Sequence, residues 1–189
     1  MRLPDFLAGI FRSAGGGSQN MNVRLCVSAA MALSLVVSTP VFSGCRKGPE
    51  VPDFELPALE GGDCKLSQEK GKVVVLSFWS FGCPYCREQI EEFRELIKMV
   101  DMNKVAIVAV HTRGGVEAAE RLRMFEGNPE IQICLDDGTV AKKYNELEEQ
   151  YRGRGVPHNL ILDKKGRIRK VRRGRTKAAD LKKDIESLL

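Results

Sequence analysis

Aromatic residues and cysteines are scarce in this chain of 189 residues, and the chain contains no internal repeat. The missing repeat excludes solenoids and propellers. Six irregularly spaced cysteines are too few for a small fold held together by disulfides. Few aromatic residues interleave with the basic residues, so we expect no nucleic-acid partner despite the net charge of +5. Hydrophobic residues at 43% and charged residues at 29% are typical of a globular protein.

The sequence between residues 21 and 44 contains no acidic residue and predicts an export signal. Arg24 precedes an uncharged apolar segment from Leu25 to Val37, and small residues follow it. A basic start, a short apolar run and small residues are the parts of a signal peptide. We therefore predict a signal peptide over residues 21–44. Residues 1–20 fit neither a signal nor a domain, and we assign them to an upstream extension that need not be native.

The segment Ser43-Gly44-Cys45 resembles a bacterial lipobox, in which the cysteine carries lipid and becomes the mature N-terminus. This resemblance predicts a lipoprotein of the bacterial cell envelope, anchored to the membrane through lipid on Cys45 and facing the periplasm or the exterior. An uncleaved anchor is one alternative, because the uncharged stretch is nominally long enough to span a bilayer. Simple secretory cleavage is the other alternative, and all three export the rest of the chain.

Residues 45–52 are short, polar and proline-containing, which predicts a tether, and residues 53–189 are predicted to form one α/β domain. Buried-strand patterns alternate with amphipathic-helix patterns along this domain. We expect a hairpin within 53–66 and strands at 72–79, 104–110, 131–135, 159–162 and 167–172. We expect helices at 84–100, 116–126, 140–151 and 178–189. This order predicts a mixed central β-sheet flanked by helices.

Cys83 and Cys86 lie three residues apart where an apolar strand is followed by a predicted helix. The N-terminus of a helix favours the thiolate form of a cysteine, and Pro84 suits the first helical turn because its missing N–H is not needed there. The second thiol, one turn away, can attack a mixed disulfide formed at the first. We therefore predict thiol–disulfide exchange, with Cys83 as the nucleophile and Cys86 as the resolving thiol.

Two other interpretations of this cysteine pair stay open. A zinc site would need two further ligands, whereas Cys64, Cys134 and the two histidines are scattered single residues. A purely structural disulfide is the second alternative. The position between a strand and a helix in an exported chain favours redox chemistry, and we expect no metal and no cofactor.

The segment from Trp79 to Arg87, with its Cys-Pro-Tyr-Cys motif, resembles the active site of thioredoxin-like proteins. Residues 155–167 resemble the segment in which that fold carries a cis-proline. The opening Pro52-Asp-Phe-Glu-Leu-Pro57 and the insertion Ile131–Tyr144 resemble the membrane-tethered TlpA/ResA branch, in which the fold carries an inserted helix–strand. The resemblance covers about residues 51–189 and implies a thioredoxin-like fold with an N-terminal β-hairpin.

The resemblance also implies roles for residues near the cysteines. It implies that Pro157 is cis and packs beside Cys83, leaving a loop at which a client backbone can pair with Val156. We expect Trp79, Pro84, Tyr85 and His158 to complete the active-site wall, although a plain core role for Trp79 is an alternative.

Three departures from the branch leave the proton acceptor for Cys86 unassigned. Ser77 stands where related proteins often carry a buried Asp or Asn, Gln89 where the branch often has Glu, and Glu91 where a proline is usual. Glu88 is the carboxylate nearest to Cys86 in sequence, and it could simply face solvent.

Three other features of the sequence carry expectations. His111 and His158 could lie near the active-site end of the sheet and stabilise a thiolate, or could have no role. Cys64 and Cys134 are expected to be small buried apolar residues, with a disulfide between them left open. Nine basic residues between 164 and 177 are expected on a solvated sheet edge, with contact to anionic lipid as the alternative.

These observations predict an exported thiol–disulfide oxidoreductase that exchanges its cysteine pair with cysteines of exported client proteins. The resemblance implies a reductant, with cytochrome c apoprotein thiols as one typical client and a membrane thiol as electron donor. A peroxide-reducing relative is a rival, although the residues before Cys83 lack the proline of the peroxidatic setting. A metal-binding module using Cys83, Cys86 and a histidine for copper is a rival of another class.

Overall fold

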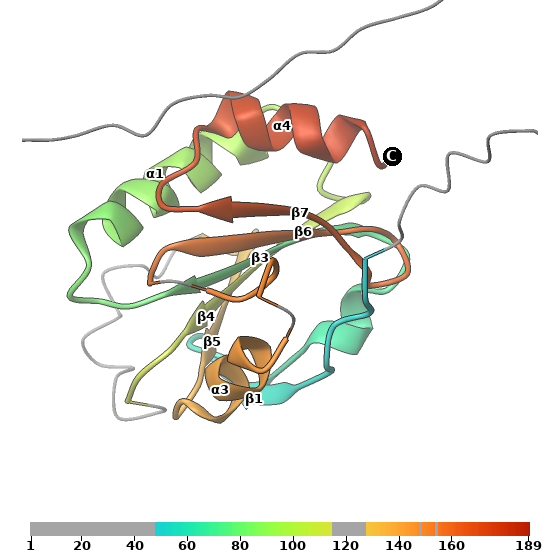
Figure 1. Cartoon of the computed structure of the whole chain (residues 1–189). Coiled ribbons are helices and arrows are strands. Elements are labelled where there is room, and N and C mark those ends of the chain that lie inside the picture. The colour runs from blue at the N-terminus through green and yellow to red at the C-terminus, as the bar shows by residue number, and fades with distance from the viewer. Residues whose placement is uncertain (1–47, 115–127, 148, 154) are drawn as a thin grey trace, which may run out of the picture. The chain divides into compact units, whose positions relative to one another are not determined.

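The computed structural model describes residues 48–114, 128–147, 149–153 and 155–189 (Figure 1). The strands are β1 (Glu55–Pro57), β2 (Asp63–Lys65), β3 (Val73–Trp79), β4 (Val105–His111), β5 (Ile131–Leu135), β6 (His158–Leu162) and β7 (Ile168–Arg173). The α-helices are α1 (Pro84–Ile97), α3 (Thr139–Asn145) and α4 (Ala178–Glu186), and a short 3-10 helix, η1, spans Leu66–Glu69.

Five strands form a mixed sheet in the order β5-β4-β3-β6-β7. Strands β3, β4 and β5 run parallel, whereas β6 is antiparallel to β3 and β7 is antiparallel to β6. Every residue of β3 and β4 is buried. The continuous apolar runs in their sequences predicted this burial, because such runs are typical of strands covered on both faces of the sheet. Strand β7 is an edge strand and carries part of the basic run, so the predicted edge position is confirmed for that part.

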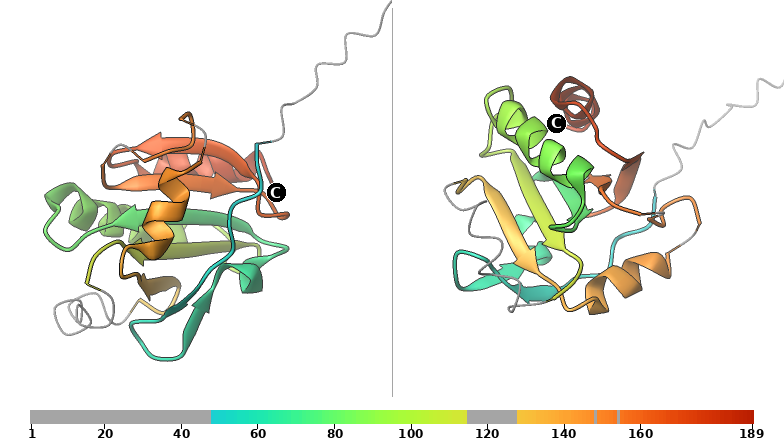
Figure 2. Two further views of the ribbon diagram at one scale, coloured as in Figure 1. Left: turned by 60° about the horizontal axis from the view of Figure 1, so that its bottom comes forward. Right: turned by 90° about the vertical axis from the view of Figure 1, so that its left-hand side faces the viewer.

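Successive side chains along each strand point to opposite faces of the sheet and pack into two separate apolar cores. Val75 and Trp79 of β3 face the core that also contains residues of α1 and α4. Leu76 and Phe78 face the opposite core, which contains residues of α3 and of the β1–β2 hairpin. Figure 2 shows α1 and α4 together on one face of the sheet and α3 on the other.

The structure confirms the predicted fold class, the hairpin and the five sheet strands to within one residue of each strand boundary. The helix predicted at 140–151 is shorter, because α3 ends at Asn145. The helix predicted at 116–126 lies outside the described residues. The predicted signal peptide, the extension at 1–20 and Cys45 also lie outside them. None of the helices in the described part of the chain is long and apolar enough to cross a membrane.

The tether predicted at 45–52 extends too far into the domain. The backbone N–H of Val51 donates to Gly166 O at 3.1 Å, and the N–H of Ile168 donates to Pro49 O at 3.0 Å. Val51 is also buried in the hairpin-side core. Residues 49–51 therefore pack as part of the domain, because their backbone groups pair with the turn that precedes β7 and with the first residue of that strand.

Candidate active site

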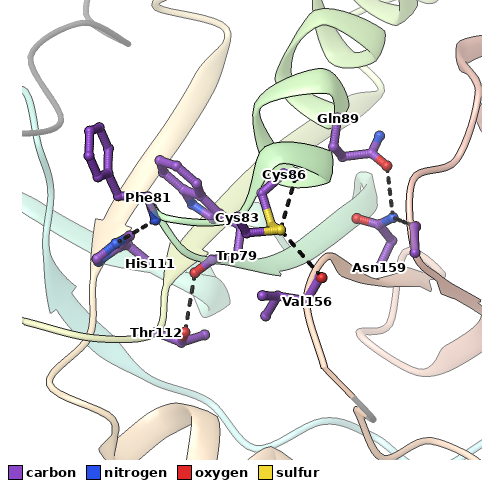
Figure 3. Close-up of a disulfide and its surroundings, with 10 residues drawn as sticks. Trp79, Phe81, Cys83, Cys86, Gln89, His111, Thr112, Val156 and Asn159 are labelled. Atoms are coloured by element: carbon purple, nitrogen blue, oxygen red, sulfur yellow. Dashed lines mark hydrogen bonds between the residues drawn. A yellow bond between two sulfur atoms is a disulfide. The ribbon is translucent and has the colours of Figure 1, made fainter.

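The two cysteines lie where β3 ends and α1 begins (Figure 3). Cys83 is the N-cap of α1, with extended backbone angles, and Pro84 occupies the first helical turn. The N–H of Cys83 donates to Ser80 O at 3.2 Å and closes the connecting turn. The strand–turn–helix sequence thus places Cys83 at the carboxyl edge of the parallel strands.

The two sulfur atoms differ sharply in exposure. Cys83 and Cys86 are joined as a disulfide with their Cα atoms 5.2 Å apart. Cys83 is half-buried, while Cys86 is fully buried in the core that contains Trp79 and Ile90. An attacking thiolate can therefore reach only the sulfur of Cys83.

Two features at the start of α1 favour the thiolate form of Cys83. The backbone N–H of Cys86 donates to this sulfur at 3.2 Å. The first turn of α1 contains no acidic residue, so the positive end of the helix dipole is not neutralised there. The sulfur also lies 3.5 Å from Val156 O, which brings the loop before β6 against the cysteine pair.

Most of the predicted wall residues lie around this pair. The Val156–Pro157 bond is cis, as the family resemblance implies, and Val156 contacts Cys83. Pro84 and Tyr85 are exposed, with Tyr85 63% exposed, and form the outer rim of the site. Trp79 is 1% exposed and packs in the core beneath the site, so its role is that of a buried support.

His158 does not belong to this wall, which corrects the expectation from sequence. Its side chain lies on the α3 face of the sheet, stacked near the Phe78 ring at 6.3 Å. Its Nε2 lies 3.0 Å from Tyr151 O, and burial, together with nearby Arg173, lowers the pKa of the imidazole below its usual value. Strand β6 alternates, so Asn159, one residue later, faces α1 instead.

His111 lies next to the active-site turn but supplies no positive charge. Its Nε2 accepts a hydrogen bond from the N–H of Phe81 at 3.2 Å, and its ring meets the Trp79 ring edge-on at 5.2 Å. Burial lowers the pKa of His111, which keeps the imidazole neutral. Neither histidine therefore places an imidazolium beside the Cys83 sulfur, which was one of the two alternatives from sequence, and His111 instead anchors the turn before Cys83.

A buried, uncharged polar cluster lies beside Cys86 on the α1 face. The amide of Gln89 accepts the Thr176 N–H at 2.7 Å and donates to Thr176 O at 3.1 Å. Asn159 Nδ2 donates to Gln89 Oε1 at 3.3 Å (Figure 3). Ser77 pairs in register with Asn159, and within the described chain Ser77 Oγ and Asn159 Oδ1 have no hydrogen-bond partner. Sequence reasoning missed Asn159 and Thr176, although Asn159 is a polar residue next to the apolar Leu-Ile-Leu run of a buried strand.

The carboxylate nearest to Cys86 in sequence lies at the surface and is paired with a cation. Glu88 is exposed and forms an ion pair with Arg175 at 2.8 Å. Arg175 also holds Glu92, whose pKa is lowered by the backbone N–H of Ala178 and by the guanidinium. These contacts join α1 to the start of α4 at the surface.

Cys64 and Cys134 form a second disulfide, with Cα atoms 5.7 Å apart. Both residues are fully buried, as expected, but they are bonded to each other rather than free. Among the residues that the structure describes, no cluster of three or more His, Cys, Asp or Glu side chains could hold a metal ion. The copper-binding rival therefore finds no ligand set in this part of the chain.

Comparison with known proteins places this geometry in a family. A model of the AhpC/TSA family matches residues 48–171. The thioredoxin-like protein YneN of Bacillus subtilis (strain 168) is 28% identical over 145 residues, covering 76% of this chain and 81% of that relative. The thiol-disulfide oxidoreductase ResA of Geobacillus thermodenitrificans (strain NG80-2) is 27% identical over 148 residues, covering 75% and 77% of the two chains.

Solved structures agree with this assignment. A putative thiol:disulfide interchange protein DsbE from Chlorobium tepidum superposes with a TM-score of 0.63 at 25% identity, covering 75% of this chain and 96% of that one. A putative protein disulfide isomerase from Bacteroides thetaiotaomicron gives 0.63 at 27% identity, covering 76% and 90%. The chain therefore belongs to the AhpC/TSA family, and it is a thioredoxin-like thiol–disulfide oxidoreductase of the ResA type.

Proposed function

We propose that the protein reduces disulfides of exported client proteins through its Cys83–Cys86 pair. The observation that carries this proposal is the asymmetry of the pair. The Cys83 sulfur is half-buried and accepts the Cys86 N–H at 3.2 Å, whereas Cys86 is fully buried beneath it. One reachable, anion-stabilised sulfur above one shielded sulfur fits an attacking and a resolving thiol.

The exchange proceeds in two displacements. The Cys83 thiolate attacks one sulfur of the client disulfide, and the first client sulfur leaves as a thiolate. Cys86 then attacks the Cys83 sulfur, which breaks the mixed disulfide and releases the second client thiolate. The Cys86 proton and one proton from solvent end on the client thiols, so two electrons pass to the client and the Cys83–Cys86 bond forms.

The client-binding surface of this proposal is the rim around Cys83. The exposed ring of Tyr85 and the loop at Val156 flank the reachable sulfur. In this proposal an extended client segment pairs with the Val156 backbone. Cytochrome c apoproteins are one client class that fits a reductant of this type. Export, lipid on Cys45 and a membrane thiol as electron donor belong to the same proposal.

Trapping tests the roles of the two cysteines. Cys86→Ala should accumulate mixed disulfides with clients, because attack at Cys83 is retained and resolution is lost. Cys83→Ala is the matched control and should trap none. Alkylation of the reduced protein at mildly acidic pH should label Cys83 first, and preferential labelling of Cys86 would overturn the assignment.

Redox titration tests whether the pair exchanges at all. Equilibration against glutathione or dithiothreitol, read by the fluorescence of the buried Trp79, should give a potential of roughly −200 to −250 mV. A value below about −300 mV, in the range of structural disulfides, would refute the catalytic function. Consumption of hydrogen peroxide by the reduced protein at a rate that exceeds exchange with a client disulfide would favour the peroxide-reducing rival.

A further inference from the structure

The Cys64–Cys134 disulfide is shielded from solvent in a way that the active-site pair is not. Both cysteines are 0% exposed, and both belong to the core on the hairpin side of the sheet. Thiol–disulfide exchange needs an attacking thiolate to approach a sulfur atom directly. No thiolate can approach either of these sulfur atoms while the domain is folded.

The active-site pair lies on the other side of the central sheet. Cys86 belongs to the core with α1 and α4, whereas Cys134 faces the hairpin from β5. Its strand neighbours Ile133 and Leu135 point to the α1 side, as alternation requires. The protein's own Cys83 can therefore neither make nor break the Cys64–Cys134 bond within one folded chain.

The Cys64–Cys134 disulfide joins the short β1–β2 hairpin to the central sheet. Strands β1 and β2 have three residues each and form a separate two-stranded sheet, which is marginally stable on its own. In addition to side-chain packing, backbone contacts join the hairpin to the edge strand β5. Ala58 forms a β-bridge with Cys134, and the Leu59 N–H donates to Ile133 O at 2.9 Å. The disulfide fastens β2 to β5 across 70 residues of sequence.

We propose that Cys64–Cys134 is a permanent structural disulfide, installed by a separate disulfide-bearing oxidant while the hairpin closes on β5 and before both sulfur atoms are buried, and that it stays oxidised while Cys83–Cys86 cycles. In the oxidation, the thiolate of one cysteine attacks a sulfur of the oxidant and displaces one oxidant thiolate. The second cysteine then displaces the other oxidant thiolate, so two electrons and two protons pass to the oxidant. The cycling of Cys83–Cys86 rests on the proposed function, whereas the permanence of the Cys64–Cys134 bond and its external oxidant do not.

Differential alkylation of the full chain tests this proposal. The folded protein is treated with dithiothreitol and alkylated, then denatured, reduced and alkylated with an isotopic form of the same reagent before peptide mapping. Cys83 and Cys86 should carry the first label, and Cys64 and Cys134 the second. Reduction of Cys64–Cys134 should be at least about tenfold slower than that of Cys83–Cys86, and denaturant should abolish the difference.

Two outcomes of the mapping would overturn the proposal. Alkylation of Cys64 and Cys134 in the denatured chain, before any reductant is added, would show that the bond does not exist. Reduction of both pairs at one rate would show that the bond is not permanent. The same map reads Cys83 and Cys86 separately, so failure of the proposed function, seen as resistance of that pair to dithiothreitol, is distinguished from failure of this inference.

A double variant tests the external oxidant. Cys83→Ala with Cys86→Ala, unfolded and reduced, should still form the Cys64–Cys134 bond when refolded with glutathione disulfide, as fast as the unaltered chain. Refolding in excess dithiothreitol should leave the bond open. A several-fold slower bond formation in the double variant would show that the chain's own pair takes part, and it would overturn the requirement for a separate oxidant.

Discussion

Gln89 makes most of the buried polar contacts beside Cys86. The substitution Gln89→Glu tests whether this cluster must stay uncharged for the domain to be stable. In the wild type, Gln89 Oε1 accepts two N–H donors and Nε2 donates to Thr176 O, at a position only 1% exposed. The substitution keeps the shape and both accepted hydrogen bonds. It replaces the donor with an oxygen that faces the Thr176 carbonyl, so the introduced carboxyl must keep its proton to avoid repulsion.

The expected loss of stability depends on how far the pKa of the introduced carboxyl rises, which is set by burial against the two N–H donors. Burial raises the pKa of a carboxyl by up to about 4 units, and donors to the carboxylate offset part of this rise. A net rise of about 2 units above the unfolded value of about 4.3 corresponds to about 3 kcal/mol. Because the folded pKa is raised, the variant should match the wild type below about pH 4.3 and lose stability as the pH rises through about 6.

Urea unfolding followed by Trp79 fluorescence at pH 5 and pH 8 measures this loss. The difference from the wild type should be about 1 kcal/mol at pH 5 and about 3 kcal/mol at pH 8. Gln89→Leu should cost about 2–3 kcal/mol at both pH values, because it leaves the Thr176 backbone groups unpaired without adding a titrating group. Glu88→Gln, at the exposed neighbouring position, should stay within about 1 kcal/mol of the wild type. A pH-independent loss for Gln89→Glu would refute the reasoning.

Three further predictions concern the stability of the domain. Asp136 is fully buried and accepts the N–H groups of the first turn of α3 at 3.0 and 2.9 Å, so Asp136→Ala should cost about 1–3 kcal/mol in urea unfolding, and a negligible cost would contradict this capping role. Arg172 donates two hydrogen bonds, of 2.8 and 2.9 Å, to the buried Asp184. Arg172→Ala should therefore lower the free energy of unfolding by about 2–3 kcal/mol and speed up amide hydrogen exchange in α4. Burial lowers the pKa of both His111 and His158, so stability should be constant above about pH 6.5 and fall as the pH drops below it, and NMR titration that places either imidazole above 6.5 would refute this.

The fold and the cysteine pair were predictable from sequence because their signals are local. The apolar run into Trp79, the Cys-Pro-Tyr-Cys motif and the helical spacing after it lie in one continuous segment, and the structure places β3, the N-cap and α1 there. The tether boundary was predicted less well, because Pro49 and Val51 pair with a turn more than a hundred residues later. Composition favours a linker at such a segment, and only its distant partner shows that it is part of the domain.

Two features of the site depend on information that the sequence does not carry locally. Whether His158 or Asn159 faces the cysteines depends on the registration of β6 against β3, where a shift of one residue exchanges the two faces. Asn159 faces α1, and there it meets Gln89 and Thr176, which come from elements far apart in the chain. Likewise, Cys64 and Cys134 become partners only when the hairpin closes on β5. The distance in sequence that left this pairing open in the sequence analysis also makes formation of the bond depend on folding. This dependence is why, in our proposal, an oxidant must act before the two sulfur atoms are buried.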